Sequence, residues 1–468
     1  MKFALPTGDP RPFVGELLER AGIAATGYEP GSRVLRSVVE NEGFTLRVFR
    51  EKDIPIQVAL GNYDLGICGD TSLREVQTRF PLQRLVRVGS LPGPRTEVWL
   101  AAAPESGLQA GQVPPAEALA GARIASDLPN MADHFAVNHR IPGYRLLSLF
   151  GSADAYPPED AELVVMAVSG PGDIEAKGLV PLARLFRGGL ALIANADSLG
   201  TKSLGGLLSR LAPLLDGEPP QAETPRATPG AAIERGGRSL DVLRIALPDG
   251  HAQRHTYTGL TEAGLRFAGY EEKTYVRRPL SGIPGVEIKV VRPQDMPQLV
   301  AMGVFDLGVT GIDWLTEHLA CFPTSPVEMV VDLGRSRYKI GPVVDEAFPA
   351  DTTRDALRRW RSLGRPVRIA SEYPALAERF AQSVQLPHTT IIPINGASEG
   401  FVPEDADILI EGSETGTSIR ANRLKMLDPF MESTNCVVAR KGPVTTQTAR
   451  LAELISRLRD SVSAAVVS

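Results

Sequence analysis

Residues 411–422, EGSETGTSIRAN, place acidic side chains and a run of glycine, threonine and serine directly after the apolar run Ile408-Leu409-Ile410. The apolar run is typical of a buried parallel strand, and the functional groups of such sheets gather at the carboxyl ends of their strands. Glycines let backbone amides approach an anion, hydroxyl side chains add donors, and carboxylates accept hydrogen bonds from ribose hydroxyls. The stretch therefore predicts a site for a phosphorylated sugar, with a helix expected to follow over residues 419–424.

The same stretch is also compatible with an ordinary exposed turn between a strand and a helix, because glycine, serine and threonine are common in such turns. It is not a Walker-type nucleotide loop, since no Gly-Lys-Ser or Gly-Lys-Thr triplet follows the glycines. Taken alone, the stretch leaves both interpretations open.

Internal repeats show that the chain is a tandem duplication. Residues 50–73 align with residues 292–315 at an offset of 242, and the identical positions include the Asp-Leu-Gly triplet at 64–66 and 306–308. Further along, the segment Arg-Ile-Ala-Ser at 123–126 returns at 368–371, an offset of 245. The small change in offset corresponds to one loop that differs in length.

The composition of the segment between the copies predicts a linker, and the alternation of strands and helices within each copy predicts four lobes in all. Residues 216–239 are rich in proline, glycine, alanine and charge, which is typical of an extended linker. In each copy, short apolar strands alternate with helical patterns, and this alternation predicts parallel sheets covered by helices. The N-terminal copy is assigned to residues 1–215, with lobes at 1–103 plus 180–215 and at 104–179. The C-terminal copy is assigned to residues 240–468, with lobes at 240–343 plus 424–468 and at 344–423.

Composition argues against several classes of protein. With 43% hydrophobic residues, 22% charged residues and a net charge of -5, the chain is typical of a globular protein and lacks a basic field for nucleic acid. Neither a secretory signal nor a run of about eighteen apolar residues is present, so we expect a cytoplasmic protein without a membrane helix. Cys68, Cys321 and Cys436 are widely separated and are expected to be buried thiols. His251 and His255 lack an adjacent carboxylate, so no metal site is expected.

Residues 411–422 resemble the phosphoribosyl-pyrophosphate loop of the ATP phosphoribosyltransferase family, the enzymes that begin histidine biosynthesis. Glu411, Ser418 and Ile419 are conservative replacements for the usual Asp, Thr and Leu of that loop. Further segments resemble the family in the same order, so that the resemblance covers nearly all of residues 242–442. These segments are residues 292–315, 332–340 (DLGRSRYKI), 368–374 (RIASEYP) and 395–399 (NGASE).

The resemblance implies a fold, a reaction and partners. The fold would be α/β, with two tandem bilobal units similar to periplasmic binding proteins, mostly parallel sheets, and a cleft between the lobes of each unit. The reaction would transfer a phosphoribosyl group from phosphoribosyl pyrophosphate to N1 of ATP, with Mg2+ carried by the pyrophosphate donor. The chain resembles two short family forms in tandem, and short forms use a regulatory subunit similar to a histidyl-tRNA synthetase. A homo-oligomer is the other partner implied, and no nucleic acid or membrane is expected.

The resemblance also implies roles for individual residues. Glu399 and Glu411 would act at the reacting centre and on the ribose hydroxyls, as the catalytic pair. The 5-phosphate of the ribose would lie on the small residues of the loop. The implied substrate-binding residues are Glu414, Thr415, Gly416, Thr417, Ser418, Asn422, Arg292, Arg337 and Lys339.

The N-terminal copy departs from this pattern at the same loop, which reads MAVSGPGDIEAK at the 245 offset. Pro171 removes a backbone donor, and Asp173 puts a negative charge where the phosphate would lie. The first copy is therefore predicted not to bind the donor, although Asp154 still stands at the position of Glu399.

Both copies depart from the family after their first strand, where two basic residues flanking a glycine are usual. Here the segments read Thr7-Gly8-Asp9 and Asp249-Gly250-His251, so the basic function is expected elsewhere, at Arg11 and Arg254. This departure leaves two alternatives to the enzyme. One is a non-catalytic bilobal regulatory protein that binds a phosphosugar or nucleotide, and the other is a phosphoribosyltransferase with a different acceptor.

Overall fold

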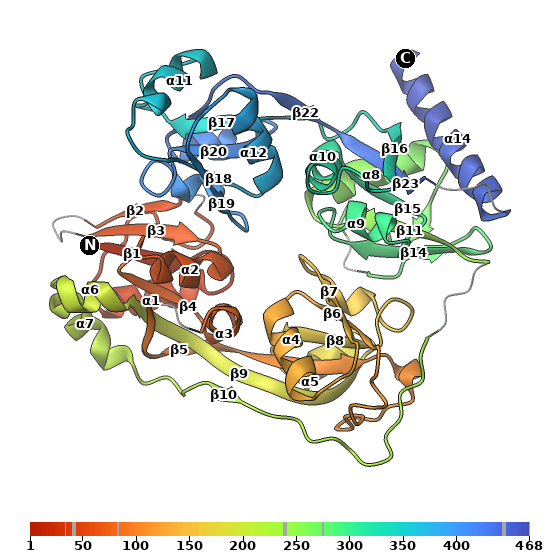
Figure 1. The fold of residues 1–468 in the computed structure, drawn as a ribbon, viewed down its shortest axis with the longest axis horizontal. Helices are drawn as coiled ribbons and strands as arrows, with labels where there is room; N and C mark the ends of the chain where they lie inside the picture. The colour runs from red at the N-terminus through yellow and green to blue at the C-terminus, as the bar shows by residue number, and fades with distance from the viewer. Residues whose placement is uncertain are drawn as a thin grey trace.

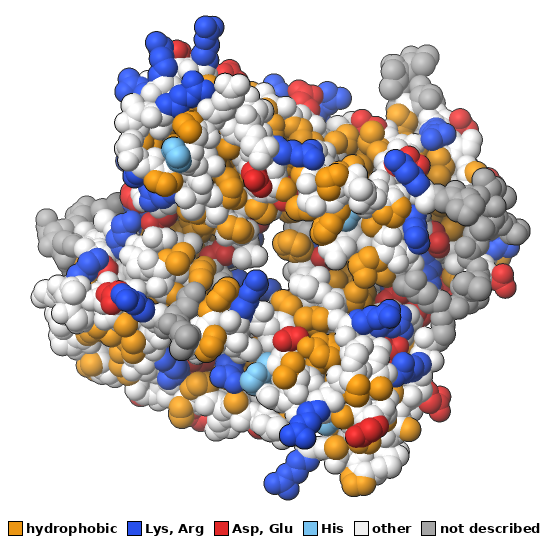
Figure 2. Space-filling model, viewed as in Figure 1, with side chains coloured by type: hydrophobic (Ala, Val, Ile, Leu, Met, Phe, Trp, Pro, Cys, Tyr) orange, Lys and Arg blue, Asp and Glu red, His pale blue; other side chains and the backbone are white. Residues whose placement is uncertain are grey.

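Four α/β lobes, two from each copy of the repeat, are arranged in a ring (Figure 1). The structure is a computed structural model that describes residues 1–32, 34–39, 44–81, 84–236, 241–273, 276–441 and 446–467. The first lobe of the N-terminal copy lies beside the second lobe of the C-terminal copy, and the two remaining lobes lie beside each other in the same way. Figure 2 shows an opening at the centre of the ring.

Each lobe is built on a parallel core in which one strand lies between two others. The apolar run Ile408-Leu409-Ile410, which was predicted as a strand, lies in one of these cores. In the N-terminal copy the cores are β3 (Thr45–Phe49), β1 (Lys2–Pro6) and β4 (Leu65–Gly69), and β7 (Arg145–Ser148), β6 (Arg123–Ser126) and β8 (Leu163–Val168). In the C-terminal copy they are β14 (Val286–Val291), β11 (Leu243–Pro248) and β15 (Leu307–Gly311), and β19 (Thr389–Pro393), β18 (Val367–Ser371) and β20 (Ile408–Ser413).

Long antiparallel strands join the two lobes of each copy. In the N-terminal copy, β5 (Leu85–Ala102) and β9 (Val180–Asn195) run through both lobes and make one ten-stranded sheet in the order β2-β3-β1-β4-β9-β5-β8-β6-β7, with β10 beside β9. In the C-terminal copy the same path is divided into β16 (Val327–Asp332) and β17 (Tyr338–Asp345), and into β22 (Met431–Ser433) and β23 (Asn435–Arg440). The C-terminal lobes therefore have separate sheets, β14-β11-β15-β23-β16 and β19-β18-β20-β17-β21, with β22 beside β17. The remaining short strands are β2 (Arg36–Val38), β10 (Gln221–Ala222), β12 (Phe267–Ala268), β13 (Leu280–Ser281) and β21 (Leu424–Met426).

Helices cover the faces of these sheets and bury their apolar sides on them. The fold class predicted from the sequence, α/β with two bilobal units in tandem, is confirmed, whereas the domain boundaries stay a prediction. No helix among the described residues is both long enough and apolar enough to cross a membrane. The helices are α1 (Arg11–Arg20), α2 (Ile54–Ala59), α3 (Asp70–Arg79), α4 (Pro129–Asn138), α5 (Pro171–Ala176), α6 (Ala196–Thr201), α7 (Gly205–Leu211), α8 (His251–Glu262), α9 (Met296–Ala301), α10 (Ile312–Cys321), α11 (Thr353–Arg361), α12 (Pro374–Ser383), α13 (Thr417–Ala421) and α14 (Thr446–Val467).

The predicted linker lies along the N-terminal copy. Near its start, the amide of Gly217 donates to the carbonyl of Ser90 at 3.2 Å, and the short strand β10 then pairs with β9. Further on, the amide of Glu234 donates to the carbonyl of Ser106 at 2.9 Å. Residues 237–239 of the predicted linker lie outside the described residues. The linker thus contacts both lobes of the first copy before it reaches the second.

One cysteine differs from its prediction. Cys68 and Cys436 are buried, as expected from the sequence, but Cys321 is exposed. It is the last residue of α10. A cysteine at the end of a surface helix carries no sequence signal that separates it from a buried one.

Equivalent ion pairs hold the two copies together on both sides of the ring. Lys2 pairs with Asp405 at 3.1 Å, and the equivalent Arg244 pairs with Asp160 at 3.3 Å. Lys289 donates to Asp160 at 2.8 Å and lies at the position equivalent to Arg47, which pairs with Glu404. The interface is therefore a two-fold arrangement within one chain, an internal dimer of the two copies.

We predict that Lys289→Met destabilises the protein by about 3 kcal/mol, because it removes one of the two cations beside a carboxylate that is fully buried. A suitable control is Lys425→Met, which breaks a pair with the exposed Asp351 and should change stability by less than about 1 kcal/mol. Denaturant unfolding of the full chain measures both. Equal effects of the two substitutions would contradict the role of the buried pair.

Candidate functional site

A cavity of about 350 Å³ opens between the two lobes of the C-terminal copy. Its lining comes from the loops at the carboxyl ends of β11, β14, β15, β18 and β20, where sheets of this kind place their ligands. Two of these loops carry the segments that the sequence singled out, residues 249–251 and the start of the stretch 411–422. The residues that line it include Asp249, His251, Arg292, Trp314, Glu372, Tyr373 and Glu414.

The stretch 411–422 folds as the end of β20, a turn and the short helix α13. Gly416 adopts the left-handed conformation with φ of +70°, which glycine allows without strain, and its amide donates to Ser413 Oγ at 2.9 Å. The hydroxyls of Thr415 and Thr417 lie 2.8 Å apart on the exposed side of the turn. The helix begins two residues earlier than predicted and ends at Ala421, because Leu424 pairs with β17 as the start of β21. The turn presents its hydroxyls together on one exposed surface.

Three glutamates gather where β18 and β20 end. Burial, with a smaller contribution from the charge of Glu372, raises the pKa of Glu411 to about 8, against the lowering effect of a hydrogen bond from Ser398. Burial also raises the pKa of Glu372 to about 7, against the lowering effect of Arg50, and Glu399 contributes to both shifts. A cluster of this kind holds a proton near neutral pH, so its members can donate as well as accept hydrogen bonds.

We predict that stability falls as the pH rises from about 5 to about 8, since the unfolded chain ionises these glutamates well below pH 7 and the folded chain retains their protons. Glu411→Gln should flatten this fall by roughly 2 to 4 kcal/mol. Unfolding free energies measured at several pH values test this, with the exposed Glu414→Gln as the control. A slope unchanged by Glu411→Gln would contradict the assignment.

A residue of the N-terminal copy reaches this glutamate cluster. The amide and side chain of Asn395 donate to the buried carboxyl of Asp53 at 3.1 and 2.7 Å, which fixes the loop of the second copy against η1 (Glu51–Asp53) of the first. A Cβ added at Gly396 would lie 3.1 Å from both Arg50 Nε and Glu372 Oε1, so both groups lie next to that glycine. An arginine of the first copy therefore lies beside the glutamate cluster of the second copy.

Sequence reasoning missed Arg50 and Glu372. The signals that could have found them were present. Arg50 occupies the same place in the repeat as Arg292, and Glu372 directly follows β18, as Glu414 follows β20. The sequence did not predict the arrangement of the ring. In this arrangement the first lobe of one copy lies against the second lobe of the other.

The predicted cations lie in three different environments. Arg292 lines the cavity and donates to Asp249 at 3.3 Å. Lys339 lies on β17 opposite Ser413, beside the loop. Arg337 lies just before β17 with its side chain 67% exposed, and it pairs with Glu432 at 3.1 Å. The structure therefore brings Arg292 to the cavity, whereas Lys339 is outside the cavity lining, on the strand that pairs with the end of β20.

The two arginines expected to replace the missing basic residues differ in their availability. Arg11 is buried, and its guanidinium donates to backbone carbonyls of the segment 27–34, so the expectation that it serves a ligand is wrong. Arg254 is on the exposed side of α8, where its Nη2 lies 3.4 Å from Nε2 of His255. The group that does face the cavity from this helix is His251, whose Nε2 lies 3.6 Å from Glu414 Oε2 on the opposite lobe.

Asn422, predicted to bind substrate, is buried in the interface between the copies. Its Oδ1 accepts from the amide of Leu35 in the first copy at 2.9 Å, and its Nδ2 donates to the carbonyl of Ser418 at 2.9 Å. The side chain thus connects the loop to the neighbouring copy. Its position indicates that it holds the loop in place rather than contacting a ligand.

In the corresponding loop of the N-terminal copy, the side chain of Asp173 bonds to the backbone of the loop itself. The carboxylate of Asp173 accepts from the amide of Ser169 at 2.8 Å, and Pro171 begins α5 without an amide donor. Asp154, equivalent to Glu399, is held by Lys177 at 3.4 Å and approached by Arg277 at 4.0 Å. An anion at this loop would meet a carboxylate in place of backbone donors.

The described residues contain no group of three or more His, Cys, Asp and Glu side chains arranged to hold a metal ion.

Comparison with known proteins gives one family. The family model "HisG: ATP phosphoribosyltransferase" matches residues 50–215 and again residues 292–460. The ATP phosphoribosyltransferase of Chlorobaculum parvum is 32% identical over 209 residues, which are 44% of this chain and 65% of that protein. That of Deinococcus deserti is 29% identical over 226 residues, 48% of this chain and 95% of that protein. The chain thus spans slightly less than two thirds of the length of relatives such as the Chlorobaculum protein.

Among solved structures, a similar one is the ATP phosphoribosyl transferase (HisG:HisZ) complex from Thermotoga maritima. It has a TM-score of 0.38 and 22% sequence identity, and the match covers 47% of this chain and 99% of that chain. The periplasmic aliphatic sulphonate binding protein SsuA from Escherichia coli has a TM-score of 0.31 and 15% identity, over 48% of this chain and 74% of that chain.

Proposed function

Since the chain belongs to the HisG family of ATP phosphoribosyltransferases, we propose that its C-terminal copy transfers a phosphoribosyl group from phosphoribosyl pyrophosphate to N1 of ATP, the first step of L-histidine biosynthesis. The products are phosphoribosyl-ATP and pyrophosphate. The observation that carries this proposal is the difference between the two loops. Residues 411–418 present hydroxyls, a glycine turn and carboxylates beside a cavity, whereas the loop of the first copy is blocked by Asp173.

The donor would lie on the turn after β20. We assign the 5-phosphate to the exposed hydroxyls of Thr415, Thr417 and Ser418, with the amide of Gly416 close by. Glu411 is the acceptor for the ribose hydroxyls, because its carboxyl lies at the start of the same turn. Mg2+ enters as the complex with the donor, since polyphosphate oxygens are the hard ligands that this ion prefers.

The reaction needs charge stabilisation and positioning more than covalent chemistry. N1 of the adenine attacks the anomeric carbon, the pyrophosphate leaves with the electron pair of the broken C–O bond, and the 6-amino group gives up a proton. We assign Glu399 to the adenine side of the cluster and Arg50, Arg292 and Lys339 to the pyrophosphate. In this account the N-terminal copy acts by supplying Arg50.

We predict that Thr415→Ala lowers kcat/KM for phosphoribosyl pyrophosphate by about tenfold or more, because a hydrogen bond to a charged phosphate is lost. Turnover is followed as the absorbance of the N1-substituted adenine product, with ATP, Mg2+ and pyrophosphatase present. Ser169→Ala, in the corresponding loop of the first copy, is the matched control and should leave turnover unchanged. If Ser169→Ala lowered turnover and Thr415→Ala did not, the donor would bind to the N-terminal copy, which would contradict the proposal.

Arg50→Ala should lower kcat by about 100-fold with a smaller effect on KM for ATP, because the arginine stabilises charge on the leaving group. Lys52→Ala is the control, since this lysine lies two residues away and pairs with Asp127 within its own copy. Full activity of Arg50→Ala in the same assay would show that the first copy contributes nothing to the chemistry.

We also propose the surroundings of the reaction. Both substrates are intracellular metabolites, so we assign the protein to the cytoplasm. The Thermotoga maritima relative is named as a complex of HisG with HisZ, and we propose that this chain binds either a second copy of itself or a regulatory subunit that resembles a histidyl-tRNA synthetase. Mass measurement of the purified protein with and without such a subunit distinguishes the two.

A further inference from the structure

A second cavity, of about 120 Å³, lies in the N-terminal copy, far in sequence from the loop 411–422. It is enclosed by α3 of the first lobe, α4 of the second lobe, β9 and the linker. Its floor is apolar and is made by Met131, Phe135, Leu185 and Phe186. Residues 222–225 of the linker form the remaining wall.

The linker wall is fixed in place by backbone and side-chain bonds. Ala222 pairs with Phe186 in the β9–β10 ladder, and the amide of Glu223 donates to the carbonyl of Leu185 at 2.9 Å. The carboxylate of Glu223 accepts from Arg184 Nε at 2.8 Å. The cavity is therefore bounded by ordered chain on each of these sides, and its single linker carboxylate is already neutralised.

The polar groups of the cavity have unused donors. Within the described part of the chain, the guanidinium of Arg74 has neither an ion pair nor a hydrogen bond, although its side chain is partly buried. On α4, Asn138 Nδ2 donates to His134 Nε2 at 2.8 Å, which places the proton of the neutral imidazole on Nδ1. Thr78 Oγ1, on the same wall as Arg74, is buried without a hydrogen-bond partner. His139 is not available, since its Nε2 bonds the carbonyl of Pro114 at 2.8 Å.

We propose that this cavity binds a small organic anion with an apolar body, of the class of aromatic carboxylates. The carboxylate would bind Arg74 in the two-pronged geometry that guanidinium favours, with His134 as a further donor. The ring would lie on Met131, Phe135 and Phe186. At about 120 Å³ the cavity is slightly smaller than the apolar cavity of about 150 Å³ that holds benzene, so it is of a size for a single ring and too small for a nucleotide.

An occupant would touch both lobes of the first copy and the linker at once. The same copy supplies Arg50 and Asp53 to the glutamate cluster of the second copy. The cavity is therefore placed to act as an effector site, separate from the substrates. The binding proposal stands on this cavity alone and does not depend on the proposed function.

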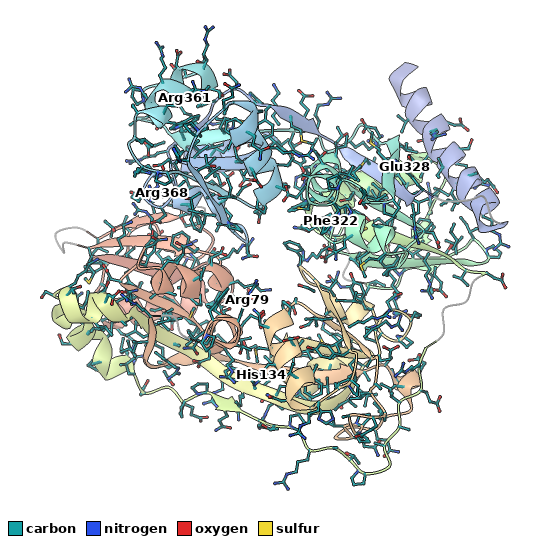
Figure 3. All side chains as sticks on the ribbon, in the orientation of Figure 1. Arg79, His134, Phe322, Glu328, Arg361 and Arg368 are labelled. Carbon is teal, nitrogen blue, oxygen red and sulfur yellow. The ribbon has the colours of Figure 1, made fainter. Side chains whose placement is uncertain are left out.

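Titration calorimetry of the full chain with benzoate tests the proposal, with benzylamine as the cation of similar shape. Benzoate should bind at millimolar concentration or below, and benzylamine about tenfold more weakly or not at all. Arg74→Ala should weaken benzoate binding by about tenfold, and His134→Leu provides a second, independent variant. The matched control is Arg79→Ala, at the end of the same helix, where the guanidinium lies over Phe80 at 5.1 Å. Figure 3 shows Arg79 nearer the centre of the ring and His134 nearer β9.

Each other outcome overturns the proposal. Absence of benzoate binding up to about 20 mM would show that the cavity holds no such anion. Equal binding of benzylamine would show that the charge of Arg74 does not select the ligand. Loss of binding in Arg79→Ala together with full binding in both Arg74→Ala and His134→Leu would place the benzoate elsewhere.

Discussion

The contact between the first lobe of one copy and the second lobe of the other is the interaction on which the rest of the structure depends. It occurs twice, with Lys2 and Asp405 on one side of the ring and Arg244 and Asp160 on the other. Because Asp160 is fully buried, the cations around it are required to offset its loss of hydration. A second contact is repeated in the same way, since Asp53 receives the amide of Asn395 as Asp295 receives that of Phe150. These repeated ion pairs and hydrogen bonds hold both junctions in the same way. The two junctions differ only in the side chains that do not take part in them.

The side chains that differ between the two junctions give the two copies different roles. At the junction that serves the C-terminal cavity, Arg50 faces a cluster of carboxyl groups whose pKa values are raised by burial. At the other junction Arg277 and Arg292 donate to Asp249 at 2.8 and 3.3 Å, and of these residues Asp249 and Arg292 also line the C-terminal cavity. The change from a basic residue to Asp249, which from the sequence looks like a lost substrate contact, has a structural explanation here. It pairs with two arginines at the junction whose loop is blocked.

The sequence predicted what is encoded locally. The strand before residues 411–422, the glycine turn and the two bilobal units follow from apolar periodicity, glycine placement and the repeat. The contacts of Arg11 and Asn422 did not follow, because both residues bond to groups that are distant in sequence or in the other copy. The sequence shows that both side chains are polar. Whether such a side chain binds a ligand or bonds within the protein depends on its burial, which the sequence does not show. Arg50 and Glu372 were missed for the same reason, since their proximity depends on how the ring closes.

We propose that the two copies of the fold share one working donor site. The most direct test is the number of donor molecules bound by the full chain, measured by titration calorimetry with phosphoribosyl pyrophosphate and Mg2+. We expect one site per chain. Two sites would show that the loop with Pro171 and Asp173 still binds the donor, and the absence of any site would show that the loop after β20 does not.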